Sequence, residues 1–123
     1  MILKPYFASL DEDGWTLDDG EQAHAQYPDT FWIPNSHDRH TLKPGDLAKL
    51  RFILGLADDE GNEEEATERM WVAVEHCLGG CYRGRLTNQP ASTDEVLVGM
   101  AVWFEARHVL DILRQEERNG REE

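Results

Sequence analysis

The sequence predicts an α+β fold that is mainly β, with little helix, and two observations lead to that prediction. Residues 68–90 alternate between apolar and polar side chains on both sides of Gly79 and Gly80, as a β-hairpin does. Residues 47–54 and 100–105 alternate in the same way. Successive strand residues point to opposite faces, so each of these strands has one apolar face. We expect about five strands in a small bent antiparallel sheet or an SH3-like barrel, a usual sheet size.

Glycine and proline predict the details of the central hairpin. Gly79 and Gly80 supply the positive φ angles that a tight turn needs. Pro90 ends the pairing, because proline has no N–H to donate to the ladder. Gly84 lies inside the second strand and predicts a bulge or bend of the kind that closes a small barrel.

The chain has 123 residues, which predicts one domain over residues 1–123. Within it we expect an N-terminal extension over residues 1–30, a β-barrel core over residues 31–113 and a charged tail over residues 114–123. The alternating segments all fall in the predicted core, and no repeat or linker divides it.

The N-terminal extension gives the weakest pattern. Residues 2–10 predict a short edge strand and residues 11–14 a turn. Trp15 and Leu17 are expected to pin the segment to the body. Residues 18–26 predict a short helix with acids near its positive end.

The remaining connections are assigned from their polar residues and helix or turn formers. Residues 37–40 are interpreted as a polar loop, although His37 and His40 at a spacing of three would share a helix face and form a metal pair there. Residues 42–46 predict a turn. Residues 91–98 predict a connection with a short helical turn, and residues 108–113 an extended strand or a short helix.

The net charge of −13 and the sequence pI of about 4.6 restrict the partners. A strongly negative field repels phosphate backbones and anionic lipids, so we expect neither nucleic acid nor membrane as a partner. A basic protein is the electrostatically natural partner. Residues 57–68 are predicted to be an exposed acidic loop, either solubilising or a docking surface. The predicted docking residues are Asp58, Asp59, Glu60, Glu63, Glu64 and Glu65.

Two cysteines, Cys77 and Cys81, flank the glycine turn. A three-residue loop would place them opposite each other, whereas a two-residue loop would stagger them and point them to different faces. A lone pair of cysteines is not the disulfide framework of a secreted protein, and no second pair completes a zinc site. The first residues show no signal peptide, and no stretch has the length of a membrane span. We expect reduced thiols in a cytoplasmic protein.

Several stretches together resemble a bacterial family of uncharacterised proteins, domain of unknown function 2314. They are LKPGDLAKLRF at 42–52, ERMWVAV at 68–74 and YRGRLTNQP at 82–90, with YPDTF at 27–31 before them and FEARHVLDI at 104–112 after them. The resemblance covers most of the chain and implies one compact domain. It brings no catalytic residues.

The chain departs from the pattern of that family at one point, where Gly99 is followed by Met100 instead of an acid. A shorter likeness involves DGW at 13–15 and DGE at 19–21. It is similar to a pattern in a related family proposed as immunity proteins of bacterial toxin systems.

Signatures of catalysis are missing from the sequence. No serine lies in a Gly-x-Ser-x-Gly elbow, no His-Glu-x-x-His helix exists, and Gly79 and Gly80 join two strands, whereas a phosphate loop leads into a helix. His76 and Cys77 are neighbours on one predicted strand and face opposite ways. We therefore expect no cofactor and no metal, and lean toward a protein that is not an enzyme.

The residues with exposed positions on the predicted strands are binding candidates. They are Trp71, Trp103, Arg69, Arg83, Arg85 and Asn88. Each also has a structural interpretation: the tryptophans pack on the N-terminal segment or a helix, and the arginines bond nearby carboxylates. Asn88 is expected to bond the local turn backbone. Arg83 and Arg85 would join Lys49 and Arg51 in one basic stripe if their strands are neighbours.

These observations favour a non-catalytic protein-interaction module of the bacterial cytoplasm. In its sharpest form it is immunity-like, with an acidic surface that covers a basic partner. The alternative is a small-ligand-binding protein or enzyme with a pocket near Trp71, Trp103 and Arg69.

Overall fold

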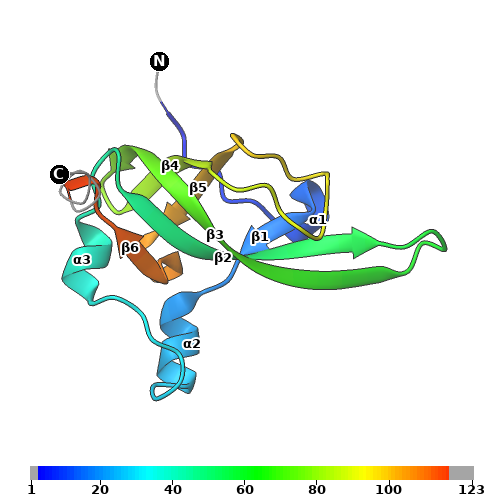
Figure 1. The fold of residues 1–123 in the computed structure, drawn as a ribbon, viewed down its shortest axis with the longest axis horizontal. Helices are drawn as coiled ribbons and strands as arrows, with labels where there is room; N and C mark the ends of the chain where they lie inside the picture. The colour runs from blue at the N-terminus through cyan, green and yellow to red at the C-terminus, as the bar shows by residue number, and fades with distance from the viewer. Residues whose placement is uncertain (1–2, 117–123) are drawn as a thin grey trace.

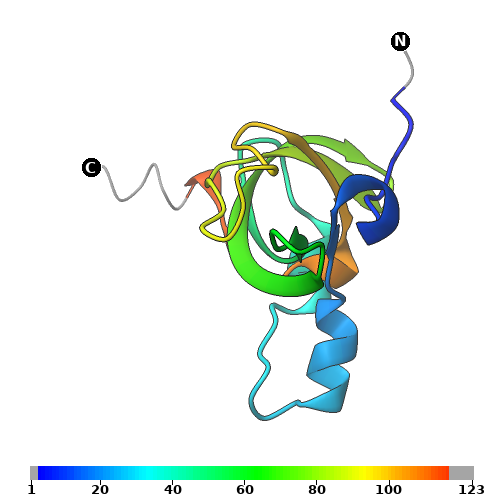
Figure 2. The ribbon, with the colours of Figure 1, turned by 90° about the vertical axis from the view of Figure 1, so that its right-hand side faces the viewer.

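The computed structural model describes residues 3–116, which form a curled, six-stranded antiparallel sheet with short helices around it (Figure 1). The strands are β1 (Trp15–Leu17), β2 (Leu47–Ala57), β3 (Glu63–Leu78), β4 (Cys81–Leu86), β5 (Ala101–Glu105) and β6 (Asp111–Leu113). Their order is β1-β2-β3-β4-β5, and β6 also pairs with β2. In Figure 2 the sheet curls around its own concave face. The prediction of a mainly β fold with a small bent antiparallel sheet is confirmed.

The helical segments are short and lie outside the sheet. They are α1 (Leu10–Asp13), α2 (Gly20–Gln26), α3 (Ser36–His40) and the 3₁₀ turn η1 (Ala106–His108). The helix predicted over residues 18–26 is confirmed as α2, which the side chain of Asp19 caps by accepting the Gln22 N–H. Within residues 3–116 no helix is both long and apolar enough to cross a membrane.

The strand β2 pairs with three other strands of the sheet. Its first residues pair with β6, its middle with β1, and its whole length with β3. Ala48, Leu50, Phe52 and Leu54 alternate along it and are all 0% exposed, as the sequence pattern predicts. From β3 they meet Met70, Val72 and Val74. Trp15 and Leu17 of β1 pack against this core and pin the N-terminal segment to the body.

The central hairpin has a two-residue turn, with Gly79 at φ 46° and Gly80 at φ 103°. Leu78 pairs with Cys81 and Cys77 with Tyr82, so the two free cysteines are staggered on different faces.

The bulge predicted from Gly84 is confirmed in the facing strand. The register between β3 and β4 shifts between Val74 and His76, beside Gly84. A Cβ at Gly84 would lie 2.4 Å from the Ala73 carbonyl oxygen, so no other residue fits there without moving the strands apart.

Several local predictions were wrong, among them the turn over residues 11–14, whose first three residues belong to α1, and the helical turn within residues 91–98, which the structure does not contain. Residues 3–9 form no strand, and the N-terminal edge strand is β1 instead. Residues 37–40 belong to α3, which the side chain of Asn35 caps by accepting the Asp38 N–H. Residues 63–68 are not part of a loop but the first third of β3, and the loop is limited to residues 58–62.

The end of the described chain is held to the body. The Arg114 guanidinium donates to the Asp46 carboxylate at 3.0 Å and to the Thr41 carbonyl at 3.0 Å. The predicted charged tail therefore starts with an anchored residue, and positions 117–123 of that tail lie outside the described residues.

Candidate functional site

The ends of β2 and β3 extend beyond the body as a two-stranded projection (Figure 1). We call residues 55–66 the acidic arm. Gly55 pairs with Glu65, Leu56 with Glu64 and Ala57 with Glu63. The arm carries six carboxylates and no lysine, arginine or histidine; they belong to Asp58, Asp59, Glu60, Glu63, Glu64 and Glu65. All six predicted docking residues thus lie on one projecting hairpin.

One of the six carboxylates builds the turn of the arm. Asp58 accepts the N–H of Glu60 at 2.9 Å and the N–H of Asn62 at 2.8 Å, and the Asn62 side-chain amide donates to it at 2.9 Å. The Asn62 side chain and these backbone N–H groups hold the pKa of Asp58 below its usual range. Asp58 is therefore a turn residue first, and its charge is partly satisfied inside the arm.

The other five carboxylates have no ionic partner in the described part of the chain. Eight pairs of basic and acidic groups lie within ion-pair distance among residues 3–116, and none involves the arm. Two of these pairs join Glu75 to Arg83 and Arg85. Seven carboxylates of the body therefore have ion-pair partners, whereas all six of the arm, like exposed body acids such as Asp11 and Asp29, are left to solvent or to a partner.

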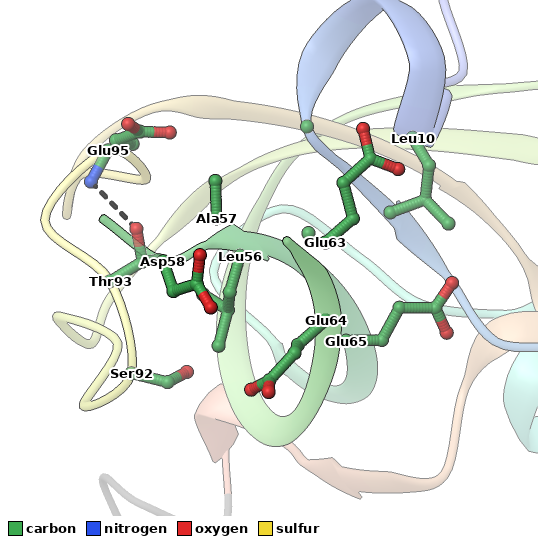
Figure 3. A pocket seen from close by; sticks show the side chains of 12 residues that line it. Leu10, Leu56, Ala57, Asp58, Glu63, Glu64, Glu65, Ser92, Thr93 and Glu95 are labelled. Atoms are coloured by element: carbon green, nitrogen blue, oxygen red, sulfur yellow. Dashed lines mark hydrogen bonds between the residues drawn. The ribbon is translucent and has the colours of Figure 1, made fainter. Parts of the chain in front are cut away.

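An open hollow of about 920 Å³ lies beside the arm (Figure 3). Its apolar lining comes from Leu10 of α1 and from Leu56 and Ala57 of β2. Its polar lining comes from the arm carboxylates and from the loop over residues 92–95. Figure 3 shows Ser92 and Thr93 on that loop, across the hollow from Leu10. The hollow thus combines a small apolar lining with several carboxylates.

Glu68 fixes the loop that forms one wall of this hollow. Its carboxylate accepts the N–H groups of Ala91 and Ser92, each at 2.9 Å, and the hydroxyl of Ser92. Burial alone would raise the pKa of Glu68, but these hydrogen bonds outweigh it and lower the pKa. The wall therefore stays attached to β3 at neutral pH.

Thr87 and Asn88 follow β4 directly, and their hydrogen bonds to Trp71 mark the point where the pairing of β3 with β4 ends. The Asn88 side-chain oxygen accepts the Trp71 N–H at 3.0 Å, and the Thr87 hydroxyl donates to the Trp71 carbonyl at 2.8 Å. The Trp71 ring lies under the Lys49 ammonium, 4.9 Å from its centroid. Asn88 thus bonds a strand backbone 17 residues away, not the local turn as predicted.

Trp103 is packed into the body. It is 8% exposed, and the Arg83 guanidinium lies 6.0 Å from its ring centroid. Arg83 and Arg85 both reach Glu75, at 3.5 and 3.1 Å. The two arginines therefore pair with a carboxylate of the protein itself, which is the structural interpretation that the sequence allowed.

The structure does not bring Trp71, Trp103 and Arg69 into one pocket. Trp103 pairs with Arg83, and Arg83 pairs with His76, which lies five residues along β3 from Trp71. At about 3.3 Å per residue the two tryptophans are well separated along the sheet. Arg69 lies over the Phe31 ring, 5.3 Å from its centroid, and has no carboxylate partner among residues 3–116. None of the three lines the hollow beside the arm.

Sequence reasoning missed the walls of the hollow. Leu10, Leu56, Ser92 and Glu95 line it, and they come from three distant segments. Only the run of acids at 58–65 could have pointed to this place, because the other residues have no pattern of their own. Among residues 3–116, no three His, Cys, Asp or Glu side chains are placed to hold a metal ion.

Comparisons with known proteins add no relative: no family model matches the chain, and no curated protein or solved structure matches it significantly. The resemblance to domain of unknown function 2314 therefore stays a prediction from the sequence.

Proposed function

We propose that the protein is a non-catalytic interaction module of the bacterial cytoplasm whose acidic arm docks on a basic protein partner. The observation that carries the proposal is the concentration of unpaired carboxylates on the arm. Asp59, Glu60, Glu63, Glu64 and Glu65 have no basic neighbour in residues 3–116, although basic groups are paired elsewhere on the body.

Electrostatics gives such an arm a defined role in association. A projecting group of like charges raises the local potential and speeds encounter with a partner of opposite charge. The hollow adds apolar surface at Leu10 and Leu56, against which a partner side chain can lose its water. An immunity-like role, in which the arm covers the basic active surface of a toxin, is the sharpest form of this proposal.

Capture of partners at increasing salt tests the proposal. The tagged protein is incubated at low salt with lysate of the organism that makes it, washed in steps of rising salt, and each fraction is identified by mass spectrometry. We expect a basic protein that elutes sharply with salt, because exposed charges are screened beyond about 10 Å at 0.1 M ionic strength.

Two variants with equal charge changes make this test specific to the arm. Glu63→Gln, Glu64→Gln and Glu65→Gln together remove three arm charges, whereas Asp11→Asn, Asp29→Asn and Glu116→Gln remove three exposed charges elsewhere. At the same salt concentration, the first variant should retain at least tenfold less of the partner than the second. Equal retention by both variants, or no basic partner at any salt, would overturn the proposal.

A further inference from the structure

We propose that the free edge of β3 over residues 63–69 binds an extended, lysine- or arginine-rich segment of the partner as an additional β-strand. This inference rests on the proposed function and says how the docking is made. Three observations support it: the hydrogen-bond pattern of β3, the unpaired backbone groups along this edge, and the charge that the edge carries.

The hydrogen-bond pattern shows which backbone groups of β3 point away from β2. In an antiparallel pair, alternate residues direct both backbone groups toward the partner strand or away from it. Trp71 directs both groups outward, since its carbonyl accepts the Thr87 N–H and its N–H reaches the Asn88 side chain. Arg69, Thr67, Glu65 and Glu63 follow at intervals of two, so their N–H and C=O groups point to the same side.

No strand covers this side of β3 within residues 3–116. The pairing with β4 begins only at Val72, opposite Leu86. Among residues 3–116 the outward backbone groups of Glu63, Glu65, Thr67 and Arg69 have no hydrogen-bond partner. Ser92 is bound to the Glu68 carboxylate, and the loop over residues 92–95 lines the hollow together with Glu64 and Glu65. Unpaired outward backbone groups therefore extend over about 23 Å at 3.3 Å per residue, bordered by the hollow at the acidic end and by the segment over residues 87–92 near Glu68.

The composition of the edge decides what can pair with it. Proteins usually protect long edges with charged side chains, proline, bulges or a covering segment, and the charges that protect this stretch are mostly negative. A second copy of this chain would bring a second group of unpaired glutamates to the same edge, and like charges on adjacent strands repel. A strand with lysine or arginine at alternate positions forms favourable cross-strand pairs with these glutamates and completes the ladder.

The probe for the test is a capped seven-residue peptide, Lys-Val-Lys-Thr-Lys-Val-Lys, titrated into ¹⁵N-labelled protein at low salt. We expect the amide signals of Glu65, Thr67 and Arg69 to shift and their hydrogen exchange to slow at least tenfold, because these amides gain acceptors. No change at these amides at millimolar peptide would overturn the inference, and the capture experiment then decides the proposed function by itself.

Two substitutions of Thr67, one that changes the backbone and one that changes only the side chain, distinguish strand addition from attraction between charges. Thr67→Pro removes an outward N–H that the fold itself does not use, whereas Thr67→Ala changes the side chain alone. We expect Thr67→Pro to weaken peptide binding at least tenfold and Thr67→Ala less than about twofold. Equal binding by both variants would overturn strand addition while the charge-based function stands. If the Glu63→Gln, Glu64→Gln and Glu65→Gln variant also binds equally, both proposals fail. Because proline can loosen the arm, the exchange measurement on the unaltered protein serves as the independent second test.

Discussion

The body of the sheet and the acidic arm are built from the same two strands, but different interactions hold them. In the body, β2 has neighbours on both sides and its residues Leu50 and Phe52 are completely buried. In the arm, Leu56 and Ala57 pair with β3 alone, and Glu63 to Glu65 are exposed. The body is stabilised by apolar burial and the arm by a ladder and a turn. A single strand can therefore contribute to the core at one end and to a binding surface at the other.

Two aspartates that hold turns give the sharpest contrast between the regions. Asp46 is 4% exposed, and it accepts hydrogen bonds from Lys43 N–H, Gln115 N–H and Arg114. Asp46→Ala leaves these donors without an acceptor and should cost about 4 kcal/mol of unfolding free energy. Asp58→Ala, at the exposed turn of the arm, should leave the midpoint of urea denaturation nearly unchanged. Equal effects of the two substitutions would contradict the contrast.

A buried histidine makes the stability of the body depend on pH. His108 is 3% exposed, and burial, with the nearby Arg107 charge, lowers its pKa from 6.5 to about 4. The unfolded state binds the proton first, so this contribution to stability is complete above pH 6.5 and is lost as the pH falls toward 4. The loss should approach about 3 kcal/mol.

Urea denaturation at several pH values measures that dependence. His108→Gln should lower stability at pH 7 but remove the slope between pH 6.5 and 4.5. The carboxylates whose pKa values are lowered, such as Asp46 and Glu68, begin to lose their contribution as the pH falls below about 4.5, so the slope between pH 6.5 and 4.5 reports on His108. A slope that persists in His108→Gln would assign the effect to another group.

Substitutions at two glycines can compare how tightly the body and the acidic arm are packed. A Cβ at Gly84, in the body, would meet the Ala73 carbonyl at 2.4 Å, whereas a Cβ at Gly55, at the root of the arm, would meet the Gly14 carbonyl at 3.3 Å. Gly84→Ala should destabilise by about 2 kcal/mol, because β3 and β4 must separate. Gly55→Ala should have less than half that effect in thermal denaturation. A larger loss at Gly55 would show that the arm is packed as tightly as the body.

Neutralising the arm should have the smallest effect on folding. Glu63→Gln, Glu64→Gln and Glu65→Gln remove mutual repulsion without breaking an ion pair. We expect a slight rise in melting temperature that disappears at high salt, since screening removes the same repulsion in the unaltered protein. A clear fall in melting temperature would mean that the glutamates stabilise the arm. Loss of the partner by this variant would then result from a changed shape of the arm and not from its lower charge.

The body was predictable from the sequence, because burial imposes a regular alternation. Phe52 and Val72 are buried at alternate positions of their strands, as the apolar alternation predicts. The glycines at 79 and 84 correctly predicted a tight turn and a bulge. The arm was not predictable as a hairpin, since Glu63 to Glu65 are exposed and leave no apolar alternation, and glutamate is uncommon in strands.

The candidate site was predictable in its charge but not in its shape. The acids at 58–65 identified the surface, while Leu10 and Ser92 reach it only through the fold. Trp71 and Trp103 were grouped because both are aromatic and lie on strands, yet their distance depends on the bulge and register of β3 and β4, which no local pattern specifies. The five residues of α3 are too few to show helical periodicity.

The pairing of β2 with strands both near and far in the sequence also sets the order in which the chain can assemble. β3 follows β2 after a short turn, whereas Leu47 pairs with Leu113, more than half the chain away. Closing the longer loop costs more chain entropy before its contacts form, so we expect the β2–β3 hairpin early in refolding and the docking of β6 last. A chain that ends before β6 keeps the hairpin but leaves the start of β2 uncovered, and two such chains can pair along that edge and aggregate.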